Sequence, residues 1–456
     1  MINVEELQRI VGEDWIITKR EQMESYLTDE TWLSIRPEPA KNVVVVKPAS
    51  SKEISEILKL ANKEKIPVYP RGGGTGLAGG AIPTQDGIVI SLERLDKIEE
   101  IDKENLMVVT QAGVTLEQLI KAVEDADLFF PLHPGDEGAQ VGGFIACNAG
   151  GARAVKYGVM RSYVKGLKVV LPTGEIINMG GKLLKNNQGL DLMHLLVGSE
   201  GILGVITKAT LRLYPRFAGT ATLVVSYNDR HEAINTVPKI LRSGVIPLAI
   251  EYVEHEEIEM SAEHLGMTWP ATKGKAHLII IVTAANEDEM YSQCERISNI
   301  CQECNAIDTL IAERREEQAD ILKMRSEMFA PLKPKTAVGL DITVPPANVG
   351  RILDEIDKIA QRFDTDIPVL GHAGDGNLHP NLMIDLKERG TLNKVEREIY
   401  EAAINLGGVI TGEQGMGKIR LGELDLCMDK KSRELMMGIK KVFDPNNILN
   451  PGTAIG

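Results

Sequence analysis

The sequence predicts an α+β protein with two domains of different composition. Up to about residue 217, short apolar runs of strand character alternate with helical segments and glycine-rich stretches. Beyond that point the glycine density falls, and apolar runs alternate with long, charged helical segments. We therefore expect an N-terminal helical extension over residues 1–37 and a first domain over 38–217. A second domain with an antiparallel sheet and helices is expected over 218–456.

The individual elements follow from hydrophobic periodicity. In the first domain, strands are expected over residues 43–46, 66–69, 88–92, 107–111 and 168–171, and helices over 51–63 and 116–124. Ser51 is of a residue type that caps helices and stands at the start of the first one. In the second domain, strands are expected over 222–226, 277–283, 339–344 and 369–372, and helices over 287–303 and 313–328.

The bulk composition is that of an ordinary globular protein, with 43% hydrophobic and 25% charged residues. The net charge of −14 argues against nucleic acid or an anionic membrane as the main partner, because both attract basic surfaces. No apolar run approaches the roughly 18 residues of a spanning helix, and the acidic N-terminus is unlike a signal peptide. We expect a cytoplasmic protein that meets a membrane, if at all, through a partner.

The five cysteines do not suggest a disulfide framework in a chain of this length. Cys301 and Cys304 form a Cys-x-x-Cys motif, which can bind metal. Cys294 and Cys301, however, lie two turns apart on one face of a predicted helix, as expected for packing. If the function requires an iron–sulfur relay, we expect another polypeptide to supply it.

The first glycine-rich segment, Arg71-Gly72-Gly73-Gly74-Thr75-Gly76, directly follows a strand-like run. A backbone without Cβ atoms can approach a pyrophosphate closely, and Arg71 adds a positive charge. Residues 74–79 match G-x-G-x-x-G, but the Rossmann fingerprint needs a helix after the loop, and the next regular run is another strand. No Gly-Lys-Ser/Thr follows, so a Walker loop is also excluded. The segment either binds phosphate by another route or is structural.

Two further stretches rich in glycine, 133–151 and 198–207, occur in the same domain. Together the three suggest a long, backbone-lined channel for an extended ligand with phosphates and an aromatic ring. The motifs are Pro70-Arg71-Gly72-Gly73-Gly74-Thr75-Gly76, His133-Pro134-Gly135-Asp136, Asn148-Ala149-Gly150-Gly151 and Gly198-Ser199-Glu200-Gly201. They resemble the flavin-binding domain of the p-cresol methylhydroxylase and vanillyl-alcohol oxidase superfamily.

This resemblance implies a two-subdomain flavin-binding domain of the p-cresol methylhydroxylase type, followed by a C-terminal cap domain. It implies FAD, bound without a covalent bond, because the first loop lacks the histidine through which some relatives attach it. The residues implied to contact FAD are Pro70, Arg71, Gly72, Gly73, Gly74, Thr75, Gly76, Leu77, Pro134, Gly135, Asp136, Gly142, Gly143, Ala146, Asn148, Gly150, Tyr157, Gly158, Glu200, Gly204, Val205, Ile206 and Asn450.

A pair of histidines occurs in the motif Gly371-His372-Ala373-Gly374-Asp375-Gly376-Asn377-Leu378-His379. Asp-Gly is a strong signal for a two-residue hairpin loop, which would place His372 opposite His379, with Asn381 on the same face. Two imidazoles so placed can share one divalent ion, or they can form a hydrogen-bonded pair without metal.

This motif and Leu449-Asn450-Pro451-Gly452 resemble the branch that holds D-lactate dehydrogenases, D-2-hydroxyglutarate dehydrogenase and the flavin-carrying subunit of glycolate oxidase. The resemblance implies a metal on His372, His379 and Glu413. Zinc, manganese and iron all suit such ligands.

The same resemblance implies three catalytic residues, which are Arg325, Asn381 and Gln414. Arg325 matches the arginine that binds the substrate carboxylate, and a guanidinium suits that task. Lys333 and Lys335 are weaker candidates. Gln414 stands where relatives carry the histidine that accepts a proton, and an amide cannot act as a base. Relatives that oxidise D-2-hydroxyglutarate carry a lysine shortly before the position of Asp341, and its absence here disfavours a dicarboxylic substrate.

The function expected from this resemblance is FAD-dependent, metal-assisted oxidation of a small 2-hydroxy acid, of the D-lactate or glycolate type, to the 2-keto acid. The electrons would pass to an electron-transfer flavoprotein, an iron–sulfur partner subunit or a quinone. Gln414 favours an alternative, namely a flavin-carrying subunit of an electron-transfer complex with weak catalysis of its own.

Overall fold

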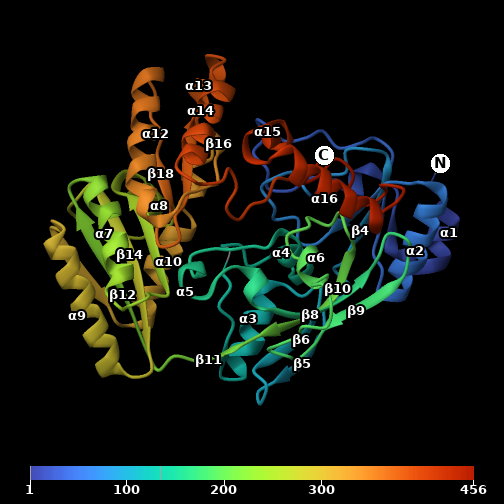
Figure 1. Cartoon of the computed structure of the whole chain (residues 1–456), viewed down its shortest axis with the longest axis horizontal. Helices are drawn as coiled ribbons and strands as arrows, with labels where there is room; N and C mark the ends of the chain where they lie inside the picture. Colours follow the sequence, from blue (N-terminus) through green and yellow to red (C-terminus); the bar gives the residue numbers. More distant parts are fainter. Residues whose placement is uncertain (1, 134) are drawn as a thin grey trace. The chain divides into compact units, whose positions relative to one another are not determined.

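The structure is a computed structural model that describes residues 2–133 and 135–456. Its contacts divide the chain into two compact units, which Figure 1 shows coloured along the sequence. The first unit comprises Met1–Ala149, Val159–Arg216 and Glu413–Gly456, and the second comprises Gly150–Gly158 and Phe217–Gly412. The C-terminal segment thus returns to the unit in which the chain begins.

The first unit contains a four-stranded sheet in the order β1-β2-β4-β3. Its strands are β1 (Ile16–Ile17), β2 (Val43–Val46), β4 (Gly87–Ser91) and β3 (Val68–Arg71). The strands β2, β4 and β3 are parallel, and β1 is antiparallel to β2. The helix α2 (Ser51–Glu64) follows β2, and its N-cap is Ser50 rather than the expected Ser51, because the Ser50 side chain accepts the backbone N–H of Glu53.

A second sheet of the first unit has five strands in the order β5-β6-β10-β8-β9, all antiparallel. Its strands are β5 (Ile98–Asp102), β6 (Met107–Gln111), β10 (Val205–Arg212), β8 (Val164–Val170) and β9 (Ile176–Gly180), and β7 (Leu128–Phe129) pairs separately with β11 (Tyr214–Pro215). The helices are α1 (Val4–Val11), α3 (Leu116–Asp125), α4 (Val141–Cys147), α6 (Met193–Leu196), α15 (Leu424–Cys427) and α16 (Lys430–Phe443).

The N-terminal segment is only partly helical, which corrects the expected helical extension over residues 1–37. Beyond α1 it forms short 3-10 turns and the strand β1. Met23 and Leu27 are buried in a hydrophobic cluster with Tyr69 and other residues of the four-stranded sheet. The segment packs against the sheet and joins it, so extended and turn conformations replace a continuous helix.

The second unit is built on an antiparallel sheet of eight strands, as the sequence predicted. Seven follow the order β15-β12-β14-β13-β18-β19-β16, and β17 also pairs with β19. Their bounds are β15 (Asp308–Ala312), β12 (Gly219–Tyr227), β14 (Ala276–Ala284), β13 (Ala249–Glu254), β18 (Val369–His372), β19 (Asn377–Met383), β16 (Thr336–Gly339) and β17 (Ile342–Thr343). The strand expected over 339–344 is therefore split at Leu340 and Asp341.

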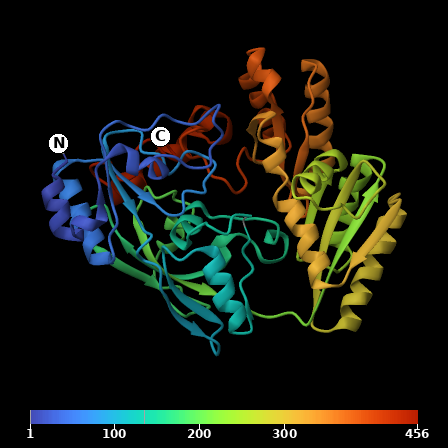
Figure 2. The same ribbon diagram turned by 180° about the vertical axis from the view of Figure 1, so that it is seen from behind.

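Helices cover both faces of this sheet (Figure 2). The helices of this unit are α5 (Ala154–Tyr157), α7 (Arg230–Arg242), α8 (His255–His264), α9 (Glu287–Glu303), α10 (Arg315–Ser326), α11 (Phe329–Leu332), α12 (Val349–Phe363), α13 (Ile384–Glu388) and α14 (Leu392–Asn405). Residues of α8, α10 and α11 form one apolar cluster with β12, β13 and β14, whereas α7 and α9 contact β12 and β14 separately. Cys294 and Cys301 of α9 are buried thiols, in agreement with a packing role.

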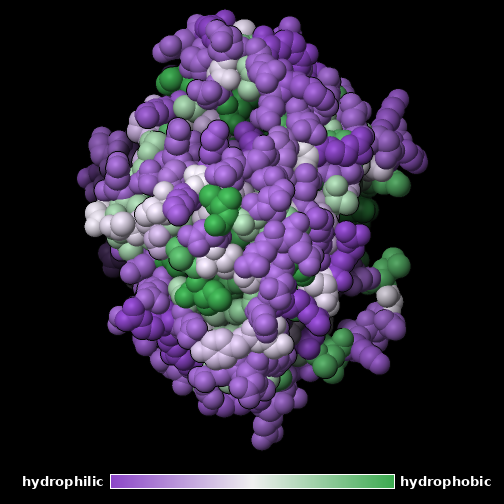
Figure 3. Space-filling view, turned by 90° about the vertical axis from the view of Figure 1, so that its left-hand side faces the viewer, coloured by the Kyte–Doolittle hydropathy of each residue, from purple (hydrophilic) through white to green (hydrophobic). Residues whose placement is uncertain are grey.

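Among residues 2–133 and 135–456, no helix combines the length and the apolar character needed to cross a bilayer. Figure 3 shows a face on which hydrophilic residues predominate and separate the hydrophobic groups from one another.

Candidate active site

The first glycine loop packs directly on the second glycine-rich block. A Cβ atom added at Gly73 would lie 2.4 Å from the carbonyl oxygen of Gly138, and one at Gly72 would lie 3.5 Å from the Cα atom of Gly143. Such a contact at Gly73 is closer than real Cβ atoms allow, so this position requires glycine for loop packing. The two stretches, which are about 65 residues apart in the sequence, therefore form one structure.

Other glycines of these loops face open space. A Cβ atom added at Gly76 or at Gly135 would meet no atom within 4 Å. Gly135 also has a φ of +89°, which favours glycine, whereas Gly76 does not lie in that region. Open space beside a glycine-lined backbone suits an extended ligand with phosphates. The loops of the first unit thus fit a dinucleotide such as FAD.

Arg71 holds the N-terminal segment against the first loop. Its guanidinium lies against Gly74 and donates hydrogen bonds to the backbone carbonyls of Thr28, at 2.7 Å, and Ser25, at 2.5 Å. The segment also bonds to the loop directly, because the Gly79 amide donates to the Thr31 hydroxyl at 2.6 Å. Arg71 is therefore a structural anchor of the loop as well as a nearby charge.

The third glycine-rich block is tied to the C-terminal segment by buried and half-buried polar groups. The Glu200 carboxylate accepts the backbone N–H groups of Met416, at 2.9 Å, and Gly417, at 2.7 Å. Burial raises the pKa of this carboxyl group. The Asn450 amide donates to the carbonyls of Gly80, at 3.1 Å, and Glu200, at 2.8 Å. Asn450 therefore joins the first and third glycine-rich stretches.

A half-buried lysine completes this polar group. The Lys418 ammonium donates to the Gly80 carbonyl and to the Asn450 side-chain oxygen, each at 3.0 Å, and lies 5.4 Å from the centre of the Tyr69 ring. Burial lowers its pKa to about 8. The sequence analysis did not single out Lys418, because no motif marks it.

Some residues predicted to bind FAD have structural contacts in this unit. Asp136 accepts the backbone N–H of Gly138 at 2.8 Å, and the Asn148 side chain accepts that of Arg161 at 2.9 Å. A Cβ atom added at Gly204 would lie 2.5 Å from a methyl group of Val169. These residues shape the loops, and their contact with a ligand stays a prediction.

The other predicted FAD contacts fall into three groups. Pro70, Thr75, Leu77, Gly142, Ala146, Val205 and Ile206 lie in or beside the loops of the first unit. Gly150, Tyr157 and Gly158 lie in the short segment Gly150–Gly158 of the second unit, and their role remains a prediction. Pro134 lies outside the described residues.

The hairpin that carries the histidine pair has a different register from the predicted one. His372 lies opposite Asn377, and Leu370 lies opposite His379. The loop therefore has four residues, Ala373–Gly376, rather than two, and the direct pairing of His372 with His379 was wrong. A shift of two residues keeps the same face, so the histidines become diagonal neighbours. Their ring centres are 5.5 Å apart.

The two imidazoles present the same nitrogen to a common point. His372 donates through Nδ1 to the Glu251 carboxylate, at 2.7 and 2.9 Å, and His379 donates through Nδ1 to the Leu340 carbonyl, at 3.2 Å. Both acceptors lack a proton to give, so Nε2 is the atom of each ring that can bind a metal. One ligand atom from each of His372, His379 and Glu413 lies within 4.8 Å of the other two.

Asp341 fixes the segment that leads to Glu413. Its buried carboxylate accepts hydrogen bonds from the Thr411 hydroxyl, at 2.7 Å, and the Gly412 amide, at 2.9 Å. On the other side it accepts the Asn377 side-chain amide at 2.9 Å. Glu413 follows Gly412 directly, so the residue that splits the expected strand also positions a candidate metal ligand.

Arg325 is an ion-pair partner of Glu251 rather than a solvated charge on a helix surface. Its Nη2 atom lies 2.8 Å from the Glu251 carboxylate, and both side chains are buried. The Nε atom of Arg325 is buried and has no hydrogen-bond partner among the described residues. The side-chain oxygen of Asn381, which is fully buried, is also unsatisfied there. Buried unpaired polar atoms are costly, so a ligand that supplied an acceptor to Arg325 Nε would be stabilised there.

Gln414 has a fixed orientation. Its side-chain oxygen accepts a hydrogen bond from Arg420 Nη2 at 3.0 Å, and Arg420 also donates to the Gly415 carbonyl at 2.7 Å. Because the oxygen accepts from the guanidinium, Arg420 sets the orientation of the Gln414 amide group.

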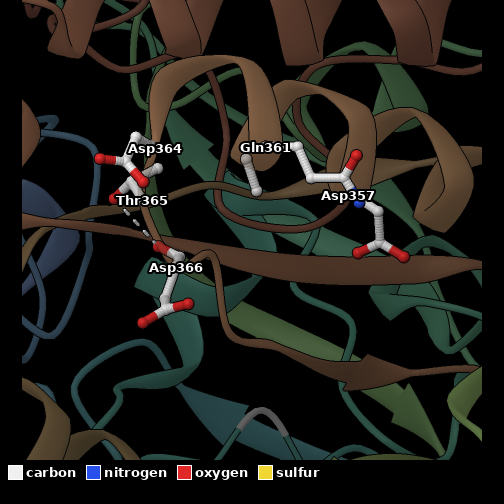
Figure 4. A pocket seen from close by; sticks show the side chains of 6 residues that line it. Asp357, Gln361, Asp364, Thr365 and Asp366 are labelled. Carbon is white, nitrogen blue, oxygen red and sulfur yellow. Dashed lines mark hydrogen bonds between the residues drawn. The ribbon is translucent and has the colours of Figure 1, made fainter.

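A separate hollow of about 390 Å³ lies at the end of α12. It is lined by Asp357, Ala360, Gln361, Asp364, Thr365 and Asp366. Figure 4 shows its three carboxylates on different sides of the hollow. None of the predicted site residues lines it, and a group of carboxylates alone does not indicate a ligand.

The most important residue that the sequence analysis missed is Glu251. It belongs to the strand Ala-Ile-Glu-Tyr-Val-Glu, in which every residue except the last is buried. An acidic residue inside a buried strand must be paired, and that signal was present in the sequence. Asp341 and Arg420 carried no comparable signal, because they lie in irregular segments.

Comparison with known proteins defines the class. Residues 43–180 match the family described as FAD binding domain, and residues 218–454 match the family described as FAD linked oxidases, C-terminal domain. The chain therefore belongs to the FAD-linked oxidases, with the FAD-binding domain of the p-cresol methylhydroxylase type that the sequence predicted.

Characterised relatives cover nearly the whole chain. It is 42% identical to a D-lactate dehydrogenase of Archaeoglobus fulgidus, over 95% of this chain and 96% of the relative. It is 39% identical to the glycolate oxidase subunit GlcD of Bacillus subtilis, over 90% of this chain and 88% of the relative. Among solved structures, p-cresol methylhydroxylase with substrate bound aligns with a TM-score of 0.79 over 99% of this chain and 96% of that one, at 16% identity. This last likeness concerns the fold.

Proposed function

We propose that this FAD-linked oxidoreductase oxidises a small 2-hydroxy acid, of the D-lactate or glycolate type, to the 2-keto acid. The observation that carries the proposal is a histidine pair grouped with a carboxylate, together with a buried arginine that shares the Glu251 carboxylate with one of the histidines. A 2-hydroxy acid needs a cation for its carboxylate and an electrophile for its hydroxyl group; the arginine would supply the first, and a metal held by the histidines and the carboxylate would supply the second. The relatives named for D-lactate and glycolate support the same class of substrate.

The substrate carboxylate would bind Arg325. Glu251 occupies one side of the guanidinium, and the buried Nε atom still lacks an acceptor among the described residues. A carboxylate oxygen of the substrate would satisfy it through a charge-assisted hydrogen bond. Gly339 and Leu340 precede Asp341 where a second carboxylate would need a cation, so a monocarboxylic acid is favoured.

His372, His379 and Glu413 would hold a divalent metal. Two neutral imidazoles and a carboxylate suit zinc, manganese or iron, and the hydrogen bonds through Nδ1 make Nε2 the metal-binding atom of each imidazole. When bound, the metal would polarise the substrate hydroxyl group and FAD would take the hydride from the α-carbon. The protein would fix the orientation of the substrate between Arg325 and the histidines.

Gln414 would hold a substrate oxygen without removing its proton. An amide is not a base, and Arg420 holds the Gln414 oxygen so that the amide nitrogen donates. The hydroxyl proton, made more acidic by the metal, would therefore pass to water rather than to a side chain at position 414.

The electrons must then pass to an acceptor. The relationship to a protein named as a subunit of glycolate oxidase supports a partner polypeptide, either an electron-transfer flavoprotein or an iron–sulfur subunit. A quinone is the other class of acceptor. We propose a protein partner, with the enzyme attached to a membrane at most through it.

Anaerobic reduction of the purified flavoprotein tests this function. D-lactate or glycolate should bleach the flavin absorbance, whereas D-2-hydroxyglutarate and L-lactate should do so more slowly or not at all. Lack of bleaching with every member of a panel of 2-hydroxy acids would contradict the proposal. It would support the alternative of an electron-transfer subunit with weak catalysis, which the Gln414–Arg420 pair favours.

A further inference from the structure

We propose that Glu251 is a positioning residue that joins the metal site to the site of the substrate carboxylate. The inference rests on the proposed function and deepens it, because it names the side chain through which the two halves of the site depend on each other. Glu251 touches neither reacting atoms nor, in the proposed site, the metal. It acts through His372 and Arg325.

The sheet places Glu251 between these two partners. Tyr252 of β13 pairs with Gly371 of β18 in an antiparallel register, so Glu251 and His372 are cross-strand neighbours. Arg325 comes from α10, whose apolar residues pack on the same sheet. The strand β18 therefore places the His372 imidazole, and the helix α10 places the Arg325 guanidinium, against the carboxylate of Glu251.

One carboxylate serves both partners at hydrogen-bond distance. Its two oxygens lie 2.7 and 2.9 Å from His372 Nδ1, and one of them lies 2.8 Å from Arg325 Nη2. Only 2% of the Glu251 side chain is exposed, so water does not compete strongly for these bonds. A charge buried to this degree is stable only with partners of this kind.

Each contact has a separate consequence. The bond to His372 fixes the tautomer that leaves Nε2 for a metal and raises the basicity of the ring as a ligand. The bond to Arg325 fixes the direction of the guanidinium, whose Nε atom lacks a partner among the described residues. Because the same carboxylate makes both bonds, its replacement must disturb metal affinity and carboxylate binding together.

Replacement of Glu251 by glutamine tests the inference, because glutamine has the same shape. It removes the negative charge and one of the two acceptor oxygens, so His372 and Arg325 must share one neutral oxygen and both bonds lose their charged acceptor. Zn²⁺ or Mn²⁺ would be titrated into chelator-treated protein, and the KM for D-lactate would be measured at saturating metal. For Glu251→Gln we expect about a 10–100-fold loss of metal affinity and a rise in KM of at least several-fold.

Glu254→Gln is the matched control. Glu254 is a carboxylate of the same strand with an arginine partner, Arg230, at 3.3 Å, and it also accepts from the Tyr252 hydroxyl. It touches neither His372 nor Arg325 in the contacts described here. We expect this variant to keep the metal affinity and the KM of the wild type.

The outcomes are distinguishable. If the wild type binds no metal, both the metal part of the proposed function and this inference are wrong. If it binds metal, and Glu251→Gln changes only the metal affinity or only the KM, the coupling role is wrong while the proposed function stands.

A double variant covers the case in which Glu251→Gln does not fold. Glu251→Gln with Arg325→Met removes the buried ion pair as a whole, which is less costly than removing one partner. Its metal affinity should fall below that of Arg325→Met alone. Equal affinities in these two variants would overturn the role of Glu251 at the metal site.

Discussion

The candidate sites in the two units are formed by different parts of the residues, namely backbone in the first unit and side chains in the second. In the first unit, the candidate binding surface consists mainly of backbone, with Gly72 and Gly73 packed on a neighbouring loop and Gly76 beside open space. In the second unit it consists of side chains, with an arginine, a glutamate and two histidines projecting from a sheet and a helix. The first surface depends on the absence of side chains and the second on their identity.

This difference decides which substitutions are informative. In the first unit, many glycines are needed only because two loops touch, so their replacement damages the fold and says little about a ligand. In the second unit, each polar side chain has a definite partner, so removing one atom can be interpreted chemically. The most useful variants are those that leave the fold intact and change one function.

The largest effect is expected from Gly76→Leu. A Cβ atom at this position meets no protein atom within 4 Å, and its φ does not require glycine, so the variant should fold. Its side chain would occupy the open space beside the loop, and we expect the purified protein to lose its yellow colour almost completely. Flavin absorbance per chain, measured after gel filtration, checks this. In the wild type, heat or acid should release the FAD into solution.

Gly438→Leu is the control, because a Cβ atom there also meets nothing within 4 Å but the residue lies on α16, outside the loops. Gly73→Leu, in contrast, should unfold or distort the first unit, since its Cβ atom would collide with the Gly138 carbonyl. Full flavin occupancy in Gly76→Leu would exclude this loop from the cofactor site.

The next largest effect is expected from His372→Ala and His379→Ala. Each removes one of three ligands, so we expect loss of a stoichiometric metal with FAD retained, because the glycine loops belong to the other unit. Elemental analysis and flavin absorbance of the same samples would measure both quantities. Retention of stoichiometric metal in both variants would show that the histidines form a metal-free pair.

Local patterns in the sequence predicted the elements well where one physical rule dominated. The helix α9 and the strands β2, β6 and β18 have the expected bounds, because periodicity and flanking polar residues agree there. The N-terminal extension was wrong beyond α1. The packing of Met23 and Leu27 against a sheet depends on residues far along the chain, and local periodicity contains no information on it.

The candidate site was predicted only in part, because local patterns identify a motif but not its partners far along the chain. The histidines were found from their motif, and they lie together even though the predicted hairpin loop was too short, because a shift of two residues preserves the face of a strand. The partners of those histidines could not be found in this way. Glu251 is 121 residues from His372 in the sequence, and only the sheet brings them together.

An intermediate effect is expected from the residues that would contact the substrate. Arg325→Ala should weaken binding of D-lactate and slow flavin reduction, because the substrate carboxylate loses its charge-assisted partner and Glu251 loses its counter-ion. Gln414→Ala should reduce the rate only modestly, whereas Gln414→His should maintain or raise it. A positioned general base is typically worth about 10²–10⁴ in rate.

Anaerobic stopped-flow reduction would measure these three variants under one set of conditions. Near-wild-type rates in Arg325→Ala combined with abolished rates in Gln414→Ala would reverse the proposed roles. That result would place the essential chemistry on the residue next to Glu413 rather than on the arginine of the second unit.

The smallest effect concerns the stability of the second unit and a buried hydrogen-bond chain in its sheet. His277 contacts the Ser226 hydroxyl through Nδ1, at 3.0 Å, and His255 through Nε2, at 2.9 Å. His255 continues the chain to Glu259, at 3.3 Å. Burial, with a smaller contribution from His255, lowers the pKa of His277 to about 4.

The folded state therefore keeps His277 neutral at a pH at which the unfolded chain, with a histidine pKa of about 6.5, binds a proton. The neutral histidine therefore leaves the free energy of unfolding at its full value above about pH 6.5. That free energy decreases as the pH falls towards 4, by at most about 3 kcal/mol. His277→Gln should reduce this dependence, so the free energy of unfolding of the variant should fall less steeply between pH 6.5 and 4. Denaturant unfolding followed by tryptophan fluorescence would measure it, since Trp269 lies 5.6 Å from the His277 ring.

Ser226→Ala is the control, because it removes one hydrogen bond but no titratable group and should lower stability without changing the slope. An unchanged slope in His277→Gln would show that other groups determine the acid sensitivity of the second unit.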